Sequence, residues 1–152
     1  MRRQPVIVHT PAYARPLEVR TRIARDLEAV GLKATRQRMV VAEVLLAGPR
    51  HMTAEQILDE LEQVGLRVSK ATVYNTLKAL TEHGLVRQIN LGDGHSVYDS
   101  TTTPHHHFHH LDTGELTDIP PDQIAFSRLP ALPSDSEATS VEVVIRVRRP
   151  KR

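Results

Sequence analysis

The sequence predicts an α+β fold in which an N-terminal winged helix-turn-helix domain precedes a small C-terminal αβ domain. Between residues 16 and 84, apolar residues recur at the spacing of amphipathic helices. After Gly84 the period changes to two, and a Gly/Asp turn at 92–94 separates two short runs, which indicates a β-hairpin. Helices followed by such a hairpin are typical of a winged helix. The remaining 50 or so residues form too small a core to be stable alone.

Composition narrows the class of protein. A chain of 152 residues suffices for one ordinary domain or two small ones. No run of about 18 apolar residues occurs, and the early run VIV is too short for a signal peptide, so we expect no membrane span and no secretion. The absence of cysteine excludes disulfides and thiolate metal sites and is consistent with the cytoplasm. Any metal would therefore be held by nitrogen and oxygen ligands.

Four helices are expected in the first domain, residues 16–100, after a flexible arm at 1–15. The first, from residue 16 to Gly31, has one apolar face, and the second runs from Thr35 to about residue 47. The third opens at Thr53, with Gln56 placed for a capping box. The fourth begins at the cap residue Ser69 and ends at Gly84. The apolar face of the first helix comprises Leu17, Ile23, Leu27 and Val30.

The second domain is predicted at residues 104–148. Strands are expected at 105–111, 114–119 and 141–148, with a short helix at 121–129 between the last two. Because this core is marginal, we expect it to be completed by pairing with a second copy, with the last strand in the shared sheet. Residues 149–152 form a basic tail that serves solubility or phosphate contact.

The fourth helix, SKATVYNTLKAL, is the segment predicted to enter a DNA groove. With Val73, Leu77 and Leu80 inward, the opposite face presents two cations around one aromatic. Residues 1–90 carry 14 Lys+Arg against 9 Asp+Glu, a weak indication of nucleic-acid binding. Two cations around an aromatic residue also occur on ordinary solvent-exposed helix faces. Here the helix directly precedes the predicted wing, and this position favours DNA binding. The predicted contacts are Lys70, Tyr74, Asn75 and Lys78, with Lys33, Arg36 and Arg38 at the start of the second helix binding phosphates or a narrow minor groove.

Histidines are concentrated at one place in the second domain. Five of the nine lie within residues 105–110, around Phe108. In a strand, alternate side chains share a face, so His105, His107 and His109 lie opposite His106 and His110. The alternative is that these histidines are exposed and bind metal only adventitiously. Five histidines within six positions favour a role as ligands.

Four segments resemble the ferric uptake regulator (Fur) superfamily: GLKATRQRMVVAEVL, HMTAEQIL, SKATVYNTLKALTEHGLV and VYD, followed by the histidine-rich strand. The resemblance covers residues 20–119 and implies a homodimeric, metal-sensing transcription factor that binds an AT-rich palindromic operator in double-stranded DNA. It implies base contacts by Tyr74 and an approach of Lys33 to the minor groove. Many members have Arg where this chain has Asn75, so the operator is expected to differ.

The resemblance also implies a divalent-metal site for iron, manganese or zinc that draws ligands from both domains. The matching positions are His51, Asp99, His107, His109 and Asp118, with Asp where members often have Glu. Metal occupancy would then change the angle between the two DNA-reading helices of a dimer. A second family site is predicted to be lost, because Phe108 and Ala125 stand where ligands are expected.

The cysteine-free pattern with HHHFHH and LDTGELTDIP is most similar to the haem-responsive iron response regulator (Irr) subfamily. That likeness implies haem as cofactor, axial ligation by His105, His106 and His107, and release of DNA on haem binding.

Three hypotheses follow. The leading one is a haem- or iron-responsive regulator, the second a divalent-metal-sensing repressor of the same superfamily, and the third a metallohydrolase with clustered histidines. The enzyme is disfavoured because no helical HExxH motif and no pocket-sized second domain are present.

Overall fold

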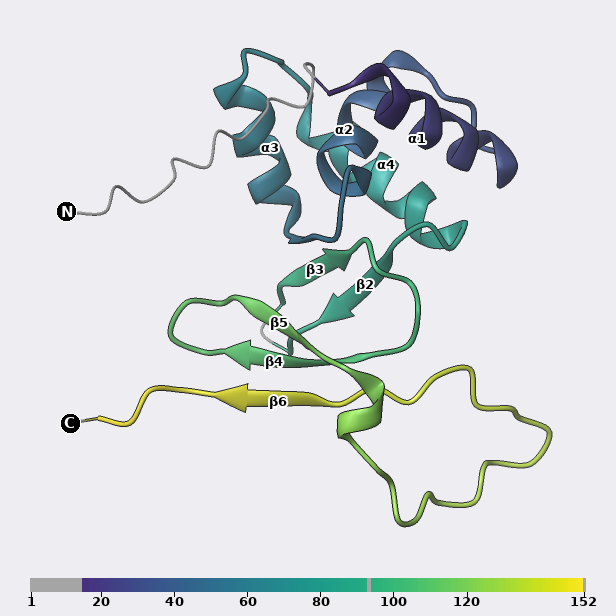
Figure 1. Ribbon diagram of the computed structural model, residues 1–152, viewed down its shortest axis with the longest axis vertical. Helices are drawn as coiled ribbons and strands as arrows, with labels where there is room; N and C mark the ends of the chain where they lie inside the picture. The colour runs from purple at the N-terminus through teal and green to yellow at the C-terminus, as the bar shows by residue number, and fades with distance from the viewer. Residues whose placement is uncertain (1–14, 93, 152) are drawn as a thin grey trace. The chain divides into compact units, whose positions relative to one another are not determined.

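The computed structural model describes residues 15–92 and 94–151 (Figure 1). The predicted arm therefore lies outside the described residues except for Arg15, as does Arg152 of the tail. The chain divides into two compact units, with the boundary between Thr102 and Thr103. We call them the N-terminal and the C-terminal unit. In the described ranges, no helix has the length and apolar character needed to cross a bilayer.

The N-terminal unit contains α1 (Leu17–Ala29), α2 (Arg36–Leu46), α3 (Ala54–Gln63) and α4 (Lys70–Glu82). The two predicted caps, Thr53 and Ser69, are confirmed, and Thr35 also caps the helix that it was predicted to start. Thr35, Thr53 and Ser69 accept hydrogen bonds from backbone N–H groups three residues later. At Thr53 the capping box is complete, because the Gln56 side chain accepts from the Thr53 N–H at 2.9 Å. Residue-level signals thus fix where these helices begin.

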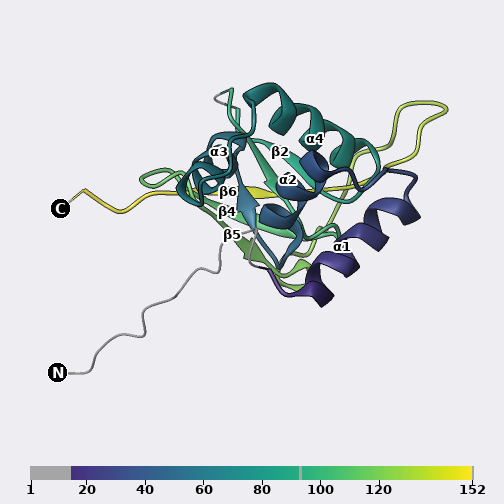
Figure 2. The same ribbon diagram turned by 90° about the horizontal axis from the view of Figure 1, so that it is seen from above.

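The core of the N-terminal unit forms where the four helices meet. Helix α2 contacts α1, α3 and α4, and Figure 2 shows it between α1 and α4. The predicted inward residues of α4, Val73, Leu77 and Leu80, are fully buried. One apolar position was predicted wrongly: Leu17 is 74% exposed. It is the first residue of α1, where no neighbouring helix covers the side chain among the described residues.

The N-terminal unit also contains a three-stranded antiparallel sheet of order β1-β3-β2, whose strand β3 contacts α3. Strands β2 (Arg87–Asn90) and β3 (Ser96–Asp99) form the predicted hairpin wing. Strand β1 (His51–Met52) was not predicted, because two residues are too short to show alternation. It pairs with the outer edge of β3 and sets His51 directly opposite Asp99.

The C-terminal unit is a sheet of order β5-β4-β6. Its central strand β4 (His106–His110) pairs antiparallel with β5 (Leu116–Ile119) and parallel with β6 (Val144–Val147). The three strands were predicted, and the α+β class of the chain is confirmed.

The predicted helix at 121–129 is wrong. Only Pro121–Gln123 forms a single 3₁₀ turn, η2, and the segment beyond it is irregular. Short helices are unstable unless an apolar face is buried. Here Phe126 and Leu129 are exposed, so no burial of apolar surface within the described chain offsets the entropy cost of ordering a helix.

Candidate functional site

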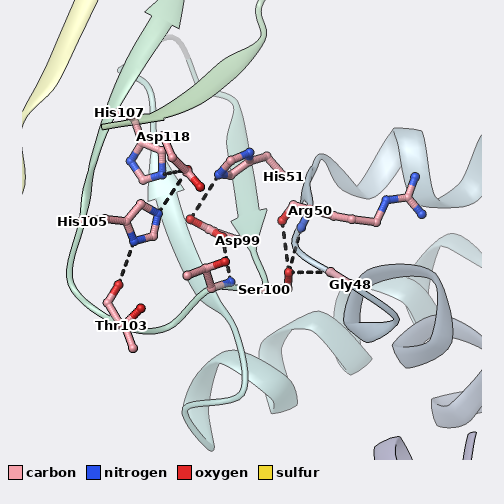
Figure 3. Close-up of polar contacts among 10 residues, drawn as sticks. Gly48, Arg50, His51, Asp99, Ser100, Thr103, His105, His107 and Asp118 are labelled. Carbon is pink, nitrogen blue, oxygen red and sulfur yellow. Dashed lines mark hydrogen bonds and ion pairs between the residues drawn. The ribbon is translucent and has the colours of Figure 1, made fainter. Parts of the chain in front are cut away.

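Two opposed residues of the wing form the first candidate ligand set, which we call the wing pair: His51 and Asp99. They face each other across β1 and β3, so their side chains share one face of the sheet. His51 Nε2 lies 3.3 Å from Asp99 Oδ2 (Figure 3). The other oxygen of Asp99 accepts from the Thr101 N–H at 2.8 Å, which fixes the carboxylate in the buried interior.

The residues next to the wing pair hold it in place. Ser100 and Arg50 are joined by two hydrogen bonds: the Arg50 N–H donates to the side-chain Ser100 Oγ at 2.9 Å, and the Ser100 N–H donates to the Arg50 carbonyl at 3.1 Å. Ser100 Oγ donates to the Gly48 carbonyl at 3.0 Å (Figure 3). The Arg50 guanidinium binds both oxygens of Glu60 on α3, at 3.0 and 2.7 Å. This bidentate contact joins the loop before His51 to α3.

The second candidate ligand set, which we call the strand cluster, consists of His105, His107 and Asp118. His107 and Asp118 are opposite each other on β4 and β5. The Nε2 atoms of His105 and His107 lie 3.3 and 3.4 Å from the same oxygen, Asp118 Oδ1 (Figure 3). The two imidazole rings are 4.5 Å apart between centroids, and His107 is only 1% exposed.

One contact determines how the His105 ring is protonated. Its Nδ1 lies 2.7 Å from the Thr103 carbonyl oxygen (Figure 3). Because a carbonyl oxygen only accepts, Nδ1 must be the protonated nitrogen. In the neutral ring, which is the form that binds metals, Nε2 then directs its lone pair at Asp118. Metal-binding histidines are commonly oriented by such a hydrogen bond from the second nitrogen.

The spacing within each set fits one cation. Two ligand atoms bonded at about 2.1 Å to one ion, at tetrahedral or octahedral angles, are themselves about 3.0–3.4 Å apart. The three nitrogen–oxygen distances are 3.3, 3.3 and 3.4 Å. Imidazole and carboxylate without thiolate are ligands suited to zinc, iron or manganese. The residues present therefore fit a divalent metal.

The predicted DNA-contacting residues of α4 lie on its exposed side. Tyr74 is 38% exposed, and Lys70 and Lys78 are exposed one turn before and after it. Lys70 Nζ lies 5.8 Å from the centre of the Tyr74 ring, within the range of a cation–π contact. Lys78 lies 3.8 Å from Glu82 of the same helix. Asn75 is also exposed.

The cations before α2 differ from one another in role. Lys33 and Arg36 are exposed. Arg38 folds back, and its Nη1 donates to the Lys33 carbonyl at 2.5 Å. Arg38 therefore shapes the loop that presents Lys33, in addition to any contact with a ligand.

A sequence profile described as the Ferric uptake regulator family matches residues 29–142. The chain belongs to the ferric uptake regulator family. It is 36% identical over 96 residues to the ferric uptake regulation protein of Pseudomonas aeruginosa, covering 62% of this chain and 72% of that protein. It is also 36% identical over 93 residues to the peroxide operon regulator of Bacillus subtilis. That match covers 61% of this chain and spans 64% of the relative's length.

A solved structure supports the same assignment. The chain resembles the ferric uptake regulator from Pseudomonas aeruginosa with manganese, with a TM-score of 0.65 and 29% identity, over 85% of this chain and 98% of that one. Proteins of the Fur family are transcriptional regulators and not enzymes. The metallohydrolase hypothesis is therefore excluded.

The strand cluster of this Fur-family chain differs from the predicted ligand set by one residue. His107 and Asp118 are together as expected, but the second imidazole beside them is that of His105 instead of His109. His109 is opposite Leu116 on β5 and is 5% exposed. Among the described residues, its Nδ1 has no hydrogen-bond partner.

The three residues predicted to ligate haem do not share a face. His106 points away from His105 and His107, as strand alternation requires. Its Nδ1 accepts from the Val143 N–H at 3.0 Å, and its ring contacts Phe126 edge to face at 6.0 Å between centroids. All three rings are buried.

Sequence reasoning missed two acidic residues on α3. Glu55 accepts a hydrogen bond from the Tyr74 hydroxyl at 2.7 Å. This bond is the main cause that lowers the pKa of Glu55 and raises the pKa of Tyr74. Glu60 binds Arg50. Neither contact has a local signal, because the partners are 19 and 10 residues apart.

Proposed function

We propose that this chain is a homodimeric DNA-binding regulator that senses a divalent metal such as manganese, iron or zinc. The observation that carries the proposal is the strand cluster. There the Thr103 carbonyl fixes the His105 ring so that its Nε2 faces the carboxylate of Asp118 at 3.3 Å. Two electron-rich atoms at this distance repel unless a proton or a cation lies between them. A second imidazole, from His107, faces the same oxygen.

We further propose that the wing pair and the strand cluster serve one ion. The strand cluster provides three ligands and the wing pair two, and five nitrogen and oxygen donors suit manganese or iron. The two sets belong to the two units of the chain. A shared ion would therefore link metal occupancy to the orientation of the DNA-binding unit, and so to the half-site spacing that a dimer can match.

The DNA part of the proposal is supported by α4, which exposes Lys70, Tyr74, Asn75 and Lys78 ahead of a β-hairpin wing. Lys33, Arg36 and Arg38 would contact phosphates or an AT-rich minor groove. With two α4 helices per dimer, the operator would be palindromic. DNA as the partner makes the cytoplasm the expected location.

The homodimer is supported by the surface of the C-terminal unit. Among the described residues of this unit, only Leu116 and Ile119 are hydrophobic and buried. Strand β6 is an edge of the sheet, and its outer side is next to no other strand of the described chain, so a second copy could extend the sheet there. Six large apolar side chains of this unit are exposed: Leu111, Phe126, Leu129, Leu132, Val141 and Ile145. Such an apolar surface is typical of an interface.

The decisive experiment measures metal binding and DNA binding on the same proteins. Calorimetric titration with Mn²⁺ and Zn²⁺ should give about one site per chain, and His107→Ala and Asp118→Asn should each weaken it at least about 100-fold. His83→Ala, an exposed histidine at the end of α4, is the matched control. DNA fragments selected with metal by the wild type should bind the two variants weakly. Wild-type affinity for metal in both variants would refute the proposal.

Haem sensing is a second candidate, supported by three consecutive histidines next to apolar residues. Haem ligation by His105, His106 or His107 would require the contacts with Asp118 or Val143 to be exchanged for iron. A haem titration of the metal-free protein distinguishes the two. A Soret shift that is lost in a His105→Ala/His106→Ala/His107→Ala variant, together with release of DNA, would favour haem. An unchanged spectrum would leave the divalent metal as the signal.

A further inference from the structure

The aromatic residue at the centre of the exposed face of α4 is tied to another helix. Tyr74 Oη donates to Glu55 Oε1 at 2.7 Å. Glu55 lies in the first turn of α3, and Tyr74 in the second turn of α4. Both residues are exposed, and Lys70 lies over the same tyrosine ring. The carboxylate therefore belongs to the surface that would face DNA, although it has the charge that phosphates repel.

This hydrogen bond uses the single hydroxyl hydrogen of Tyr74. A tyrosine hydroxyl has one hydrogen to donate and lone pairs with which to accept, whereas an ionised carboxylate only accepts. The Tyr74 hydrogen bond is the largest cause that lowers the pKa of Glu55, and Lys70 acts in the same direction. The pKa of Tyr74 is raised, mainly by the same bond. At neutral pH the proton thus stays on Tyr74 and points at Glu55.

We propose that Glu55 is a specificity-determining residue: by accepting the hydrogen bond that the Tyr74 hydroxyl donates, it leaves the Tyr74 oxygen able only to accept hydrogen bonds from DNA. In the major groove, adenine N6 and cytosine N4 are donors, whereas thymine O4 and guanine O6 are acceptors. The tyrosine oxygen would therefore favour adenine or cytosine at the position it contacts. The proposal rests on the DNA-binding function proposed above.

The charge of Glu55 has a separate effect, which makes the proposal testable. A carboxylate beside phosphates opposes binding to every sequence and changes its salt dependence. Glutamine removes this charge but keeps an oxygen that can accept from Tyr74. Aspartate keeps the negative charge in the first turn of α3, where it interacts favourably with the helix dipole. Its side chain is one methylene shorter, so it should not reach the Tyr74 hydroxyl. The two variants separate charge from hydroxyl orientation.

The experiment uses the full chain with Mn²⁺ present. Wild type and the variants Glu55→Gln, Glu55→Ala, Glu55→Asp and Tyr74→Phe are each used to select duplexes from a random pool. Affinities are then measured by fluorescence anisotropy on the selected duplex and its single-base variants over a range of salt. Circular dichroism melts show which variants remain folded. Glu62→Gln, an exposed glutamate near the end of α3, is the matched control for loss of charge.

The proposal makes a distinct prediction for each variant. Tyr74→Phe and Glu55→Ala should lose the preference for adenine or cytosine at the same operator position, by about fivefold, the worth of one hydrogen bond. Glu55→Asp should behave like Glu55→Ala in base preference while its stability stays close to that of the wild type. Glu55→Gln should keep the preference and bind all sequences more tightly, which Glu62→Gln should not do to the same extent.

Two outcomes overturn the inference, and they are distinguishable. If the wild type selects a sequence while Glu55→Ala keeps the same base profile, Glu55 has no part in base choice and only this inference fails. If the wild type selects no sequence with or without Mn²⁺, the DNA-binding function fails and the inference fails with it.

Discussion

At the scale of single residues, the candidate metal site depends on which imidazole joins His107. The strand places His105 and His109 on the same side as His107. The His105 ring is held by the Thr103 carbonyl at Nδ1, and its Nε2 lies toward Asp118. His109 is opposite Leu116, an apolar neighbour that supplies no ligand.

His105 and His109 are therefore predicted to respond differently to substitution. His105→Ala should weaken Mn²⁺ and Zn²⁺ binding at least about tenfold. His109→Leu should leave the affinity within about twofold. It should also stabilise the fold by up to about 1 kcal/mol, because it removes a buried nitrogen that has no hydrogen-bond partner among the described residues. Calorimetry and urea unfolding measure these effects. Loss of metal binding in His109→Leu alone would restore the ligand set predicted from the sequence.

This difference shows how far the sequence could predict the site. Motif and family predicted the types of ligand and the positions His51, Asp99, His107 and Asp118. The structure places His51 beside Asp99 and His107 beside Asp118. The choice between His105 and His109 could not follow from alternation, because both positions satisfy it. It depends on the register of β4 with β5, which no local pattern encodes.

At the scale of elements, predictions held where a signal lies within one segment. The capped helices and the wing hairpin carry their own start and turn residues. The helix at 121–129 failed because its apolar residues have no surface to cover them within the described chain. Strand β1 was missed because it exists only through pairing with β3.

Helix α3 holds the loop before His51 through an ion pair. Through Glu60 it holds Arg50, the residue before His51, with both side chains about three-quarters buried. Glu60→Gln should break the bidentate ion pair and leave the guanidinium partly unpaired, which should destabilise the fold by about 1–3 kcal/mol. Because the loop before His51 loosens, metal affinity should also fall by about tenfold.

The control for this prediction is Glu62→Gln on the same helix, which should change neither quantity. Urea unfolding and metal titration are compared for the two variants. If Glu60→Gln lowers stability but leaves metal affinity unchanged, Arg50 supports the fold without positioning His51.

At the scale of the whole molecule, the chain divides into two compact units, with the boundary between Thr102 and Thr103. Each unit contains a His–Asp pair directly opposed across two antiparallel strands: His51 with Asp99, and His107 with Asp118. Two ligands are few for a divalent cation that takes four to six. The wing pair alone would therefore bind metal weakly, and the burial of Asp99 favours a role completed by other ligands.

If both sets serve one ion, substitutions in either unit should have the same effect. His51→Ala and Asp118→Ala should each weaken Mn²⁺ binding at least about 100-fold, although they lie in different units. Metal should lower the radius of gyration of the wild type in solution scattering and slow its proteolysis around residues 100–104, because a shared ion restricts the motion of one unit against the other. Both responses should disappear in either variant. Wild-type metal affinity in His51→Ala would mean that the strand cluster binds the ion alone, and the sensor would then lack this link to the DNA-binding unit.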